Sequence, residues 1–421
     1  MAEDSILTDD FVRELINVGE VDILVGVPTY NNAKTIEPAI QAIQAGILRA
    51  FPRERAVIIN ADGGSTDGTP ELVTGASISD SRRTFNGYTL RTLHSISTQY
   101  APSPSSGIAL QTILSAAELL RAKACAVISP DSVNVEAEWI TKLLDPVYKE
   151  KYDFVAPLYR RNRFEGVLLT NLVYPMTRAM FGKKVREPYA SEFSFSGNLG
   201  GRFLAQHDWR QEFDQPDPRM DLTISALAGD YRVYQTFLGD KSQDRQTRDL
   251  VQAMRQTIGV VFASLQPNLA VWSSRNGAQP VPGNGSEHEL VLDPLRVNRK
   301  QLKQMFSAGV ADLESVLSAI LKESTLTSLK QIAALGEDEM RYPADLWVKT
   351  VYEFAASYNK PVMSRDHIVQ ALAPLYRGRM FTFLVENRNG SAEDVENNIE
   401  SLCLEFERGK PYLLELWNGG K

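Results

Sequence analysis

Short runs of hydrophobic residues alternate with segments of helical spacing along the first half of the chain. Residues 21–27 and 56–60 are compact runs rich in β-branched side chains, ended by a proline and by an Asp-Gly-Gly turn respectively. Runs of this length and composition predict buried strands. Between them, apolar side chains recur every three to four positions, at Ile36, Ile40, Ile43 and Ile47. This order of strand, helix and strand predicts a βαβ unit with parallel strands.

The same alternation continues to about residue 265. We expect strands over 88–92, 124–128 and 153–158, a helix that begins near 67–70 and another over 108–122. Open parallel sheets hold their ligands outside the carboxyl ends of the strands. The polar loops that follow the strands over 21–27 and 56–60 are therefore expected to lie at that edge of the sheet.

The hydrophobic pattern changes in the last third of the chain. Residues 266–293 hold prolines and glycines among polar residues, which predicts a linker or a long loop. Beyond it, apolar residues recur at three-and-four spacing, which predicts helices with buried faces. The expected organisation is an α/β domain over 1–265, the linker over 266–293 and a mainly α-helical domain over 294–421.

Composition agrees with two globular units. The chain has 421 residues, 43% hydrophobic and 23% charged, and is longer than a usual single core. No apolar stretch reaches the roughly 20 residues that cross a bilayer, so we expect no transmembrane anchor. The first residues include early acidic side chains and lack the basic-then-apolar order of a secretory signal. A cytoplasmic location is therefore expected.

Charge, cysteine and histidine content exclude several other classes. The formal net charge of −7, without a long basic run, gives no basis for binding nucleic acid. Cys125 and Cys403 are far apart and form no CxxC motif, so neither a disulfide framework nor a thiolate zinc site is expected. The four histidines are scattered, and we expect surface or capping roles for them.

The segment 60–69 is the first candidate for chemistry. It places Asp62 at the end of a strand, then two glycines that permit close backbone approach, then Asp67 before the next helix. This arrangement suits a nucleotide. An ordinary helix-capping turn is the alternative, because Ser, Thr and Asp side chains accept hydrogen bonds from free N–H groups at the start of a helix.

Two motifs in series resemble the opening of a family 2-type glycosyltransferase of the GT-A fold, a Rossmann-like nucleotide-sugar-binding fold. Residues 28–36 read PTYNNAKTI and residues 62–69 read DGGSTDGT, similar to the P-x-x-N and D-x-[GS]-S-x-D-x-T signatures of that family. The resemblance implies that these loops hold the nucleobase and ribose of a sugar donor. The donor-binding positions that it implies are Pro28, Tyr30, Asn32, Asp62 and Gly63.

The loop Ser129-Pro130-Asp131 stands where that family has its D-x-D motif. The resemblance implies that Asp131 binds a divalent cation, Mg²⁺ or Mn²⁺, at the donor diphosphate, and that Ser129 lies in the same donor site. Carboxylate and phosphate oxygens are hard ligands that suit such a cation. The alternative is that Asp131 caps the helix that follows.

Residues 20–265 also resemble a narrower group, the retaining transferases that make mannosylglycerate and glucosyl-3-phosphoglycerate. The matching blocks are LYRR at 158–161, EPYASE at 187–192 and DPRMD at 217–221. The resemblance implies an acceptor site with Arg160, Arg161, Tyr189 and Glu192, and catalytic roles for Glu192 and Asp221.

Two further positions come from the same resemblance. Gly107 stands in the stretch that corresponds to a Gly-Lys-Gly of the donor site. Gln243 or Asp244 stands near the position of a metal-binding histidine and would supply an oxygen ligand. Lys241 or Arg245 would add positive charge beside the diphosphate.

The resemblance implies transfer of a hexose from GDP-mannose, UDP-glucose or GDP-glucose to a small hydroxylated acceptor such as glycerate or 3-phosphoglycerate, with retention of configuration. Asp221 would position the sugar or, in an inverting reaction, act as general base. The alternatives are a soluble inverting transferase that extends a saccharide chain, and a degenerate protein that only binds nucleotide sugars. The helical C-terminal region would cover the acceptor or form a homodimer contact.

Overall fold

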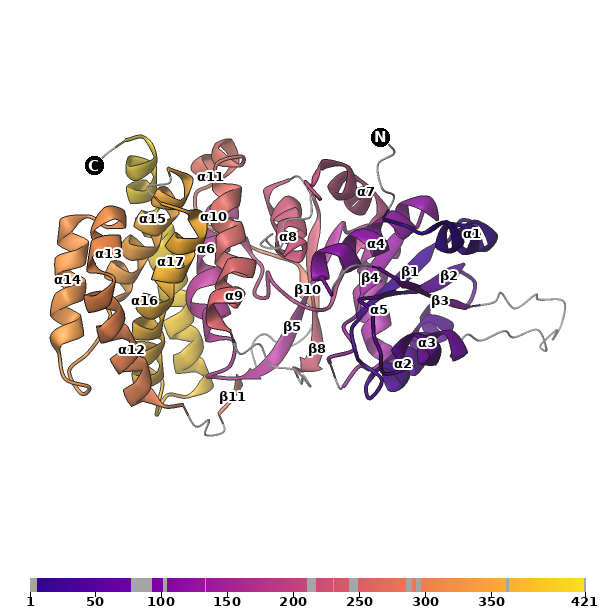
Figure 1. Cartoon of the computed structure of the whole chain (residues 1–421), viewed down its shortest axis with the longest axis horizontal. Coiled ribbons are helices and arrows are strands. Elements are labelled where there is room, and N and C mark those ends of the chain that lie inside the picture. The colour runs from indigo at the N-terminus through magenta and orange to yellow at the C-terminus, as the bar shows by residue number, and fades with distance from the viewer. Residues whose placement is uncertain are drawn as a thin grey trace. The chain divides into compact units, whose positions relative to one another are not determined.

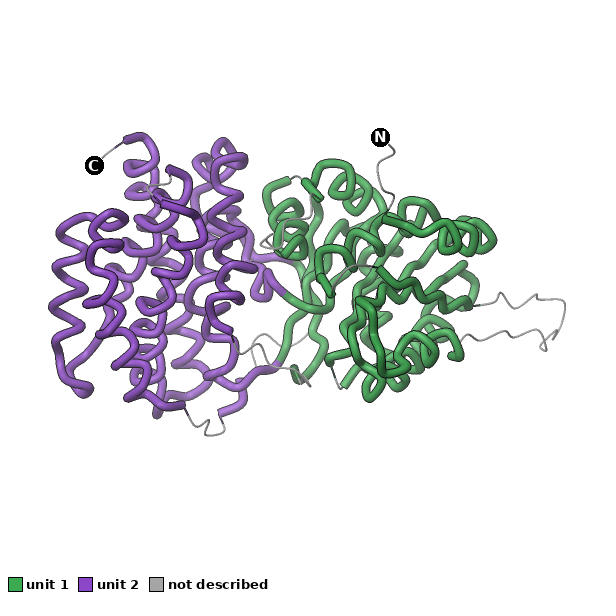
Figure 2. Tube along the Cα trace, in the orientation of Figure 1, with its two compact units in different colours: residues 1–159, 190–246, 282–285 green, residues 160–189, 247–281, 286–421 purple. Residues whose placement is uncertain are grey.

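The computed structural model describes residues 6–76, 93–100, 104–132, 134–209, 217–229, 231–241, 249–284, 290–292, 297–360 and 363–419 (Figure 1). By internal packing the chain divides into two compact units (Figure 2). The first unit holds residues 1–159, 190–246 and 282–285, and the second holds 160–189, 247–281 and 286–421. Each unit is thus assembled from separate stretches of sequence.

A mostly parallel sheet forms the centre of the first unit. Its strands are β1 (Ile23–Thr29), β2 (Ala56–Asp62), β3 (His94–Gln99), β4 (Ala124–Val127), β5 (Phe154–Asn162), β7 (Phe193–Ser196), β8 (Val233–Asp240) and β10 (Gly283–Asn284). They lie in the order β10-β8-β5-β7-β4-β1-β2-β3. β1 pairs in parallel with β2 and β4, and β2 with β3, whereas β7 is antiparallel to β4 and β5.

Helices cover this sheet and complete the core. They are α1 (Asp9–Val18), α2 (Ile36–Ala50), α3 (Thr69–Gly75), α4 (Ser106–Leu119), α5 (Ala137–Tyr148), α7 (Gly197–Gln206) and α8 (Pro218–Ala228). All residues of β2 are buried. The isoleucines of α2 and Trp139 of α5 share one apolar cluster with the side chains of β1. Removing this apolar surface from water is the main driving force for the fold of the unit.

The α/β class predicted for this part is confirmed. β1, β2, β4 and β5 fall on the expected hydrophobic runs, and α2 and α4 fall on the expected periodicities. Parallel strands covered on both faces need continuous apolar runs, which is why the pattern located them. The strand expected over 88–92 lies outside the described residues, and the described strand β3 begins later, at His94.

The second unit is mainly helical, as predicted for the C-terminal region. Its helices are α6 (Tyr174–Phe181), α9 (Leu250–Met254), α10 (Val260–Leu265), α11 (Leu269–Ser274), α12 (Arg299–Asp312), α13 (Glu314–Ile320), α14 (Glu323–Ala334), α15 (Ala344–Asn359), α16 (Arg365–Glu386) and α17 (Ala392–Trp417), with π-helical turns η1 (Leu169–Val173) and η2 (Arg255–Gly259). Short strands β6 (Lys183–Lys184), β9 (Gln279–Pro280) and β11 (Leu290–Val291) complete it. None of the described helices is both long and apolar enough to cross a bilayer.

The units do not follow the division expected at residue 265. Residues 160–189 and 247–281 belong with the C-terminal helices. The stretch 266–293, expected to be a linker, contains α11 and three short strands. Trp272 of α11 is fully buried, and its ring lies 5.4 Å from that of Trp417 in α17. The prolines and glycines of this stretch predicted a loop, but an aromatic anchor holds part of it in the helical unit.

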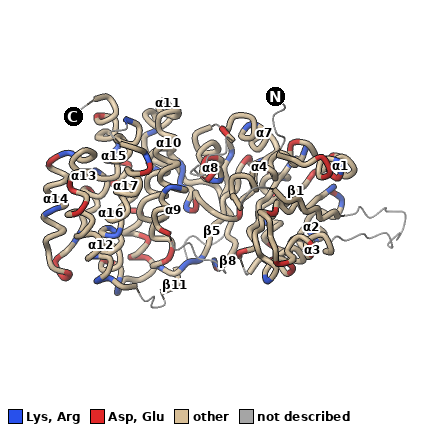
Figure 3. The backbone as a smooth tube through the Cα atoms, viewed as in Figure 1, with Lys and Arg blue, Asp and Glu red and all other residues tan. Residues whose placement is uncertain are grey.

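Charged residues of both signs are mixed along the described chain (Figure 3). One group is buried: Arg178 of α6 has a side chain only 1% exposed and is paired with Glu400 and Glu407 of α17. Arg178 Nη2 donates to Glu400 Oε1 at 2.8 Å, and Nε donates to Glu407 Oε1 at 2.7 Å. The hydrogen bond from Arg178 lowers the pKa of Glu400 to about 2. This fork fixes α6 to α17.

We predict that Arg178→Met destabilises the second unit, because the mostly buried carboxylate of Glu407 loses the guanidinium that donates to it. The free energy of unfolding should fall by about 3 kcal/mol in urea at pH 7. Arg408→Met, which removes the exposed partner of Glu405, should change it by less than about 0.5 kcal/mol. Equal losses in the two variants would contradict a structural role for the buried fork.

Candidate active site

The carboxyl ends of β1 and β2 bring the two predicted donor-binding loops together. The strands pair in parallel, and Thr29 lies opposite Asp62 in the register. Pro28 is the penultimate residue of β1, and the next loop begins with Tyr30, whose side chain is 40% exposed. The predicted loops therefore lie side by side at the edge where parallel sheets hold ligands.

Asp62 organises this edge from within. Its side chain is fully buried. Oδ1 accepts hydrogen bonds from Thr29 Oγ1 at 2.7 Å and Ser65 Oγ at 2.6 Å. Oδ2 accepts from the backbone N–H groups of Gly64 at 3.0 Å and Ser65 at 2.8 Å. The geometry gives Asp62 the role of shaping the loop, while the direct donor contact expected from the sequence stays a prediction.

Further hydrogen bonds join the loop after β1 to the loop after β2. Asn31 donates its backbone N–H to Ser65 Oγ at 2.8 Å and accepts from the N–H of Thr66 at 2.9 Å. Asp67 Oδ2 accepts from the N–H of Ala33 at 2.9 Å. Asn31 has a φ of 53°, a left-handed conformation that asparagine tolerates better than most residues. The two sequence motifs are thus parts of one local structure.

The helix-capping alternative accounts for only part of this segment. Asp67 Oδ1 accepts from the N–H and hydroxyl of Thr69, the first residue of α3, at 3.2 and 2.6 Å. The N-cap residue itself is Gly68, which has no side chain to cap with. Asp67 therefore serves both the helix start and the junction of the loops.

Close backbone packing explains the glycine at position 63. The N–H of Gly63 donates to the carbonyl of Thr29 at 2.8 Å. A Cβ atom there would lie 3.0 Å from the hydroxyl oxygen of Tyr100 and 3.1 Å from Cα of Pro104. Gly107, the other predicted glycine of the donor site, lies in the first turn of α4, where a Cβ atom would lie 3.6 Å from Cδ of Pro218.

Asn32 connects the joined loops to the predicted metal ligand. Its side-chain Nδ2 donates to Asp131 Oδ1 at 2.8 Å, and its backbone N–H donates to Thr69 Oγ1 at 2.9 Å. The N–H of Asp131 in turn donates to Ser129 Oγ at 3.3 Å. The helix that follows begins at Ala137 with Glu136 as N-cap. The capping alternative for Asp131 is therefore wrong, and its carboxylate lies at the candidate site.

A second buried polar group centres on Glu192. Ser132 Oγ donates to Glu192 Oε1 at 2.6 Å, Lys241 Nζ donates to Oε2 at 2.6 Å, and the Tyr159 hydroxyl also donates to Oε2. The Lys241 ammonium lies 4.6 Å from the centre of the Tyr159 ring. The side chains of Lys241 and Glu192 are 6% and 0% exposed. Ser132, next to Asp131, joins this group to the candidate metal ligand.

The charge state of Glu192 follows from these partners. Burial alone would raise the pKa of Glu192, but the Lys241 ammonium and the three hydrogen bonds outweigh it, so the pKa of Glu192 is lowered. Glu192 is therefore an ionised, acceptor-only group at neutral pH. Sequence reasoning found Glu192 and Lys241 but assigned no role to Tyr159 or Ser132, although Tyr159 stands in the LYRR block and Ser132 directly follows Asp131.

Asp221 has the opposite environment. It lies in the first turn of α8, where Asp217 is the N-cap and accepts from Ser106 Oγ of α4 at 3.0 Å. Burial and the nearby charge of Asp217 raise the pKa of Asp221 to about 7. His207 Nδ1 lies 3.4 Å from Asp221 Oδ2, with its ring stacked on Phe203. Sequence reasoning placed His207 among surface or capping residues and missed this pair.

The predicted acceptor residues other than Glu192, namely Arg160, Arg161 and Tyr189, belong to the second unit. There Arg161 donates to both carboxylate oxygens of Glu187, at 2.7 and 2.9 Å. Gln243 and Asp244 lie outside the described residues. Within the described part of the chain, no three His, Cys, Asp or Glu side chains are grouped to hold a metal ion. Of the predicted metal ligands, Asp131 is therefore the one that lies among the described residues, beside Asn32.

The fold and the joined loops define a mixed α/β protein whose candidate site lies at the carboxyl edge of a mostly parallel sheet. No protein-family model matches the chain, and no curated protein matches it. Solved structures similar to it include glucosyl-3-phosphoglycerate synthase from Mycobacterium tuberculosis in complex with Mn²⁺, uridine diphosphate and glucosyl-3-phosphoglycerate. That match has 20% identity and a TM-score of 0.39, and covers 62% of this chain and 84% of that chain.

Two other solved structures agree with this likeness. Mannosyl-3-phosphoglycerate synthase from Rubrobacter xylanophilus matches with 18% identity and a TM-score of 0.40, over 64% of this chain and 82% of that chain. The Mycobacterium tuberculosis synthase in complex with Mg²⁺ and uridine diphosphate matches with 19% identity and a TM-score of 0.38, over 61% and 82%. These synthases belong to the group that the sequence resembles. Identity and TM-score are both low, so the likeness assigns this chain no activity.

We predict that Asp221→Asn stabilises the protein at alkaline pH. The pKa of Asp221 in the folded protein is raised from 3.8 to about 7, so its ionisation costs stability as the pH rises through that window. The neutral amide avoids this cost and should raise the free energy of unfolding at pH 8 by about 2 kcal/mol. At pH 4 the two proteins should be equally stable.

Urea unfolding at pH 4, 6 and 8 measures this effect, with the exposed Asp10→Asn as the control that should be neutral throughout. Destabilisation by Asp221→Asn at pH 8 would show instead that the ionised carboxylate is stabilised by its pairing with His207.

Proposed function

We propose that the chain is a nucleotide-sugar-dependent hexosyltransferase whose donor binds over the joined loops of the first unit. The observation that carries this proposal is the Asn32 side chain, which ties the loop after β1 to Asp131 after β4 while its backbone binds Thr69 beyond β2. Three neighbouring parallel strands thereby present one continuous set of polar groups at their carboxyl edge. A ligand with a base, a ribose and phosphates requires such an extended set.

Each part of this edge suits a part of the donor. The exposed ring of Tyr30 and the ring of Pro28 offer a surface for a nucleobase. The backbone of Gly63 and Gly64, in the loop after β2, would contact the ribose. Asp62 maintains the conformation of this backbone through its four hydrogen bonds. Ser129 and Asp131 are proposed to lie beside the diphosphate.

Asp131 would hold a divalent cation, Mg²⁺ or Mn²⁺, together with Gln243. A small number of protein carboxylates fits this function, because Mg²⁺ is usually bound through one or two carboxylates and substrate phosphates. When bound, the cation would neutralise charge on the departing diphosphate. The amide of Asn32 orients Asp131 by donating to its Oδ1 at 2.8 Å.

Glu192 and Asp221 would order the sugar and acceptor hydroxyls, and Arg160, Arg161 and Tyr189 would bind an acidic acceptor such as glycerate or 3-phosphoglycerate. The ion pair with Lys241 makes Glu192 a fixed acceptor of hydrogen bonds rather than a proton donor. Arg161 is already held in a planar fork by Glu187, which orients its guanidinium. In a retaining reaction the departing phosphate takes the acceptor proton.

One observation favours an inverting reaction as the second candidate. With a pKa of about 7, Asp221 is close to the optimum for a general base at neutral pH. Its function would then be to take the proton from the acceptor hydroxyl. The anomeric configuration of the product, read by proton NMR, separates the two reactions.

We predict that Asp131→Ala lowers turnover by about 100-fold, because the charge that develops on the diphosphate loses its partner. The assay measures nucleoside diphosphate released from GDP-mannose, UDP-glucose or GDP-glucose with glycerate or 3-phosphoglycerate, with and without Mg²⁺ or Mn²⁺. Glu138→Ala, an exposed acid of α5, is the matched control and should keep full activity. Folded wild-type protein that releases no diphosphate from any pair, yet binds a nucleotide sugar, would instead be a binding protein on this fold.

A further inference from the structure

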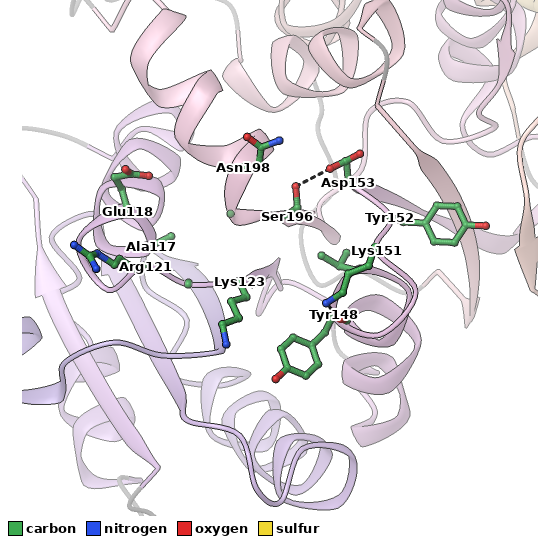
Figure 4. Close-up of a pocket in the computed structure, with 13 residues that line it drawn as sticks. Ala117, Glu118, Arg121, Lys123, Tyr148, Lys151, Tyr152, Asp153, Ser196 and Asn198 are labelled. Carbon is green, nitrogen blue, oxygen red and sulfur yellow. Dashed lines mark hydrogen bonds between the residues drawn. The ribbon is translucent and has the colours of Figure 1, made fainter.

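A cavity lies at the opposite edge of the same sheet, within the first unit. Its volume is 420 Å³ (Figure 4). Lys123 immediately precedes β4, Asp153 immediately precedes β5, and Ser196 ends the antiparallel β7, so the cavity is at the amino ends of the parallel strands. The candidate active site uses the carboxyl ends. The cavity is therefore separate from that site, and its volume is within the range of small-molecule pockets.

Three cations line this cavity: Arg121, Lys123 and Lys151. Arg121 pairs with Glu20 at 2.9 Å and Lys123 pairs with Asp22 at 2.7 Å. The side chains of Arg121 and Lys123 are 78% and 64% exposed, and ion pairs this exposed to water are weak. Little free energy is therefore needed to separate these pairs so that the cations can bind an anion.

Two of these cations occupy backbone positions that normally favour glycine. Arg121 follows α4 with a φ of 50°, and Lys151 follows α5 with a φ of 62°. At the end of α4 the N–H of Ala122 donates to the carbonyl of Ala117, the closing bond for which a left-handed glycine is preferred. At the end of α5 the N–H of Tyr152 donates to the carbonyl of Pro146. A cation near a helix C-terminus is favourable by itself, but that holds for any residue of the last turn. Two cationic residues have left-handed backbone conformations after two helices and line the same cavity. Their position at helix ends does not by itself explain why both are cationic.

Two carboxylates, Glu118 and Asp153, also line the cavity. Asp153 Oδ1 accepts from Ser196 Oγ at 3.0 Å, and Oδ2 accepts from the N–H of Arg232 at 3.0 Å. At the N-terminus of α7, the N–H of Gly197 donates to the carbonyl of Lys123 at 3.1 Å, and the N–H of Leu199 donates to Ser196 Oγ at 3.2 Å. Three cations and two carboxylates give the lining one net positive charge.

We propose that this cavity binds a phosphate-bearing small molecule. Lys123 and Lys151 hold the phosphate, because ammonium groups form charge-assisted hydrogen bonds with phosphate oxygens. Asn198, at the start of α7, lines the same cavity. Val147 and Tyr148 line the remaining wall and give the organic part of the molecule an apolar contact. The volume exceeds that of a bare phosphate ion, so the ligand is a phosphate ester rather than inorganic phosphate. This inference does not rest on the proposed transferase activity.

The experiment titrates phenyl phosphate into the full chain and measures binding by calorimetry. A second titration uses inorganic phosphate for comparison. Phenyl phosphate should bind the tighter of the two. Lys123→Met and Lys151→Gly should each weaken its binding about tenfold. Lys149→Ala, in the same turn but outside the cavity lining, should leave binding unchanged.

Lys151→Gly separates binding from stability, since glycine relieves the left-handed conformation. This variant should melt at a higher temperature than the wild type while binding phenyl phosphate more weakly. Hydrogen exchange should slow around residues 121–123 and 196–198 when phenyl phosphate is present. No binding at all, equal binding in the three variants, or slowing confined to residues 62–69 would overturn the proposal.

Discussion

The buried carboxylate of Asp62 is the constraint on which the candidate active site depends. It receives four hydrogen bonds from the end of β1 and from the glycine-containing loop after β2. Only an ionised carboxylate has enough acceptor positions to satisfy all four donors, which explains why this position needs an acid. The loop geometry that follows allows Asn31 and Asn32 to join their loop to it, and through Asn32 the arrangement extends to Asp131. A residue that a motif marks as ligand-binding thus acts first as the organiser of the backbone.

Glu192 and Asp221 show how one unit gives two carboxylates different properties. Glu192 is fully buried and Asp221 is partly buried, and burial by itself favours the neutral form of a carboxyl group. Glu192 has the Lys241 ammonium against it and stays ionised, whereas Asp221 has the Asp217 carboxylate nearby and holds its proton to about pH 7. Paired acids whose pKa values are pushed apart are a common basis for dividing tasks in an active site. Lys241 lies 49 positions from Glu192 in the sequence, so no local motif predicts that ion pair, whereas Asp217 and Asp221 stand in the same short block.

Hydrophobic periodicity predicted the strands of the sheet and the helical C-terminal region, because burial on both faces of β1 and β2 leaves a continuous apolar run in the sequence. The motifs also located the two loops after those strands. The sequence identified Asp131 but left open whether it binds a ligand or caps a helix. The structure excludes the cap, because the next helix begins only at Ala137 and Asp131 instead accepts a hydrogen bond from a residue 99 positions earlier. Tyr159 stands in the LYRR block and Ser132 beside Asp131, but their hydrogen bonds to Glu192, 33 and 60 positions away, appear only in the folded chain. Two units were predicted, but the stretch 266–293 was expected to be a linker or long loop because its glycines and prolines gave no sign that Trp272 is buried in the helical unit.

The interleaving of the two units has a consequence for how the protein is made. No single cut of the chain releases either unit whole, because each contains segments from both sides of the other. On the ribosome, β1 to β5 emerge early, but the edge strand β10 follows only after residues 247–281, which belong to the helical unit. The edge of β8 therefore has no partner strand until residues 247–281 and β10 have been synthesised. A gene shortened at residue 265 would encode a sheet without its last strand, so the two halves of this protein can be inherited or exchanged only together.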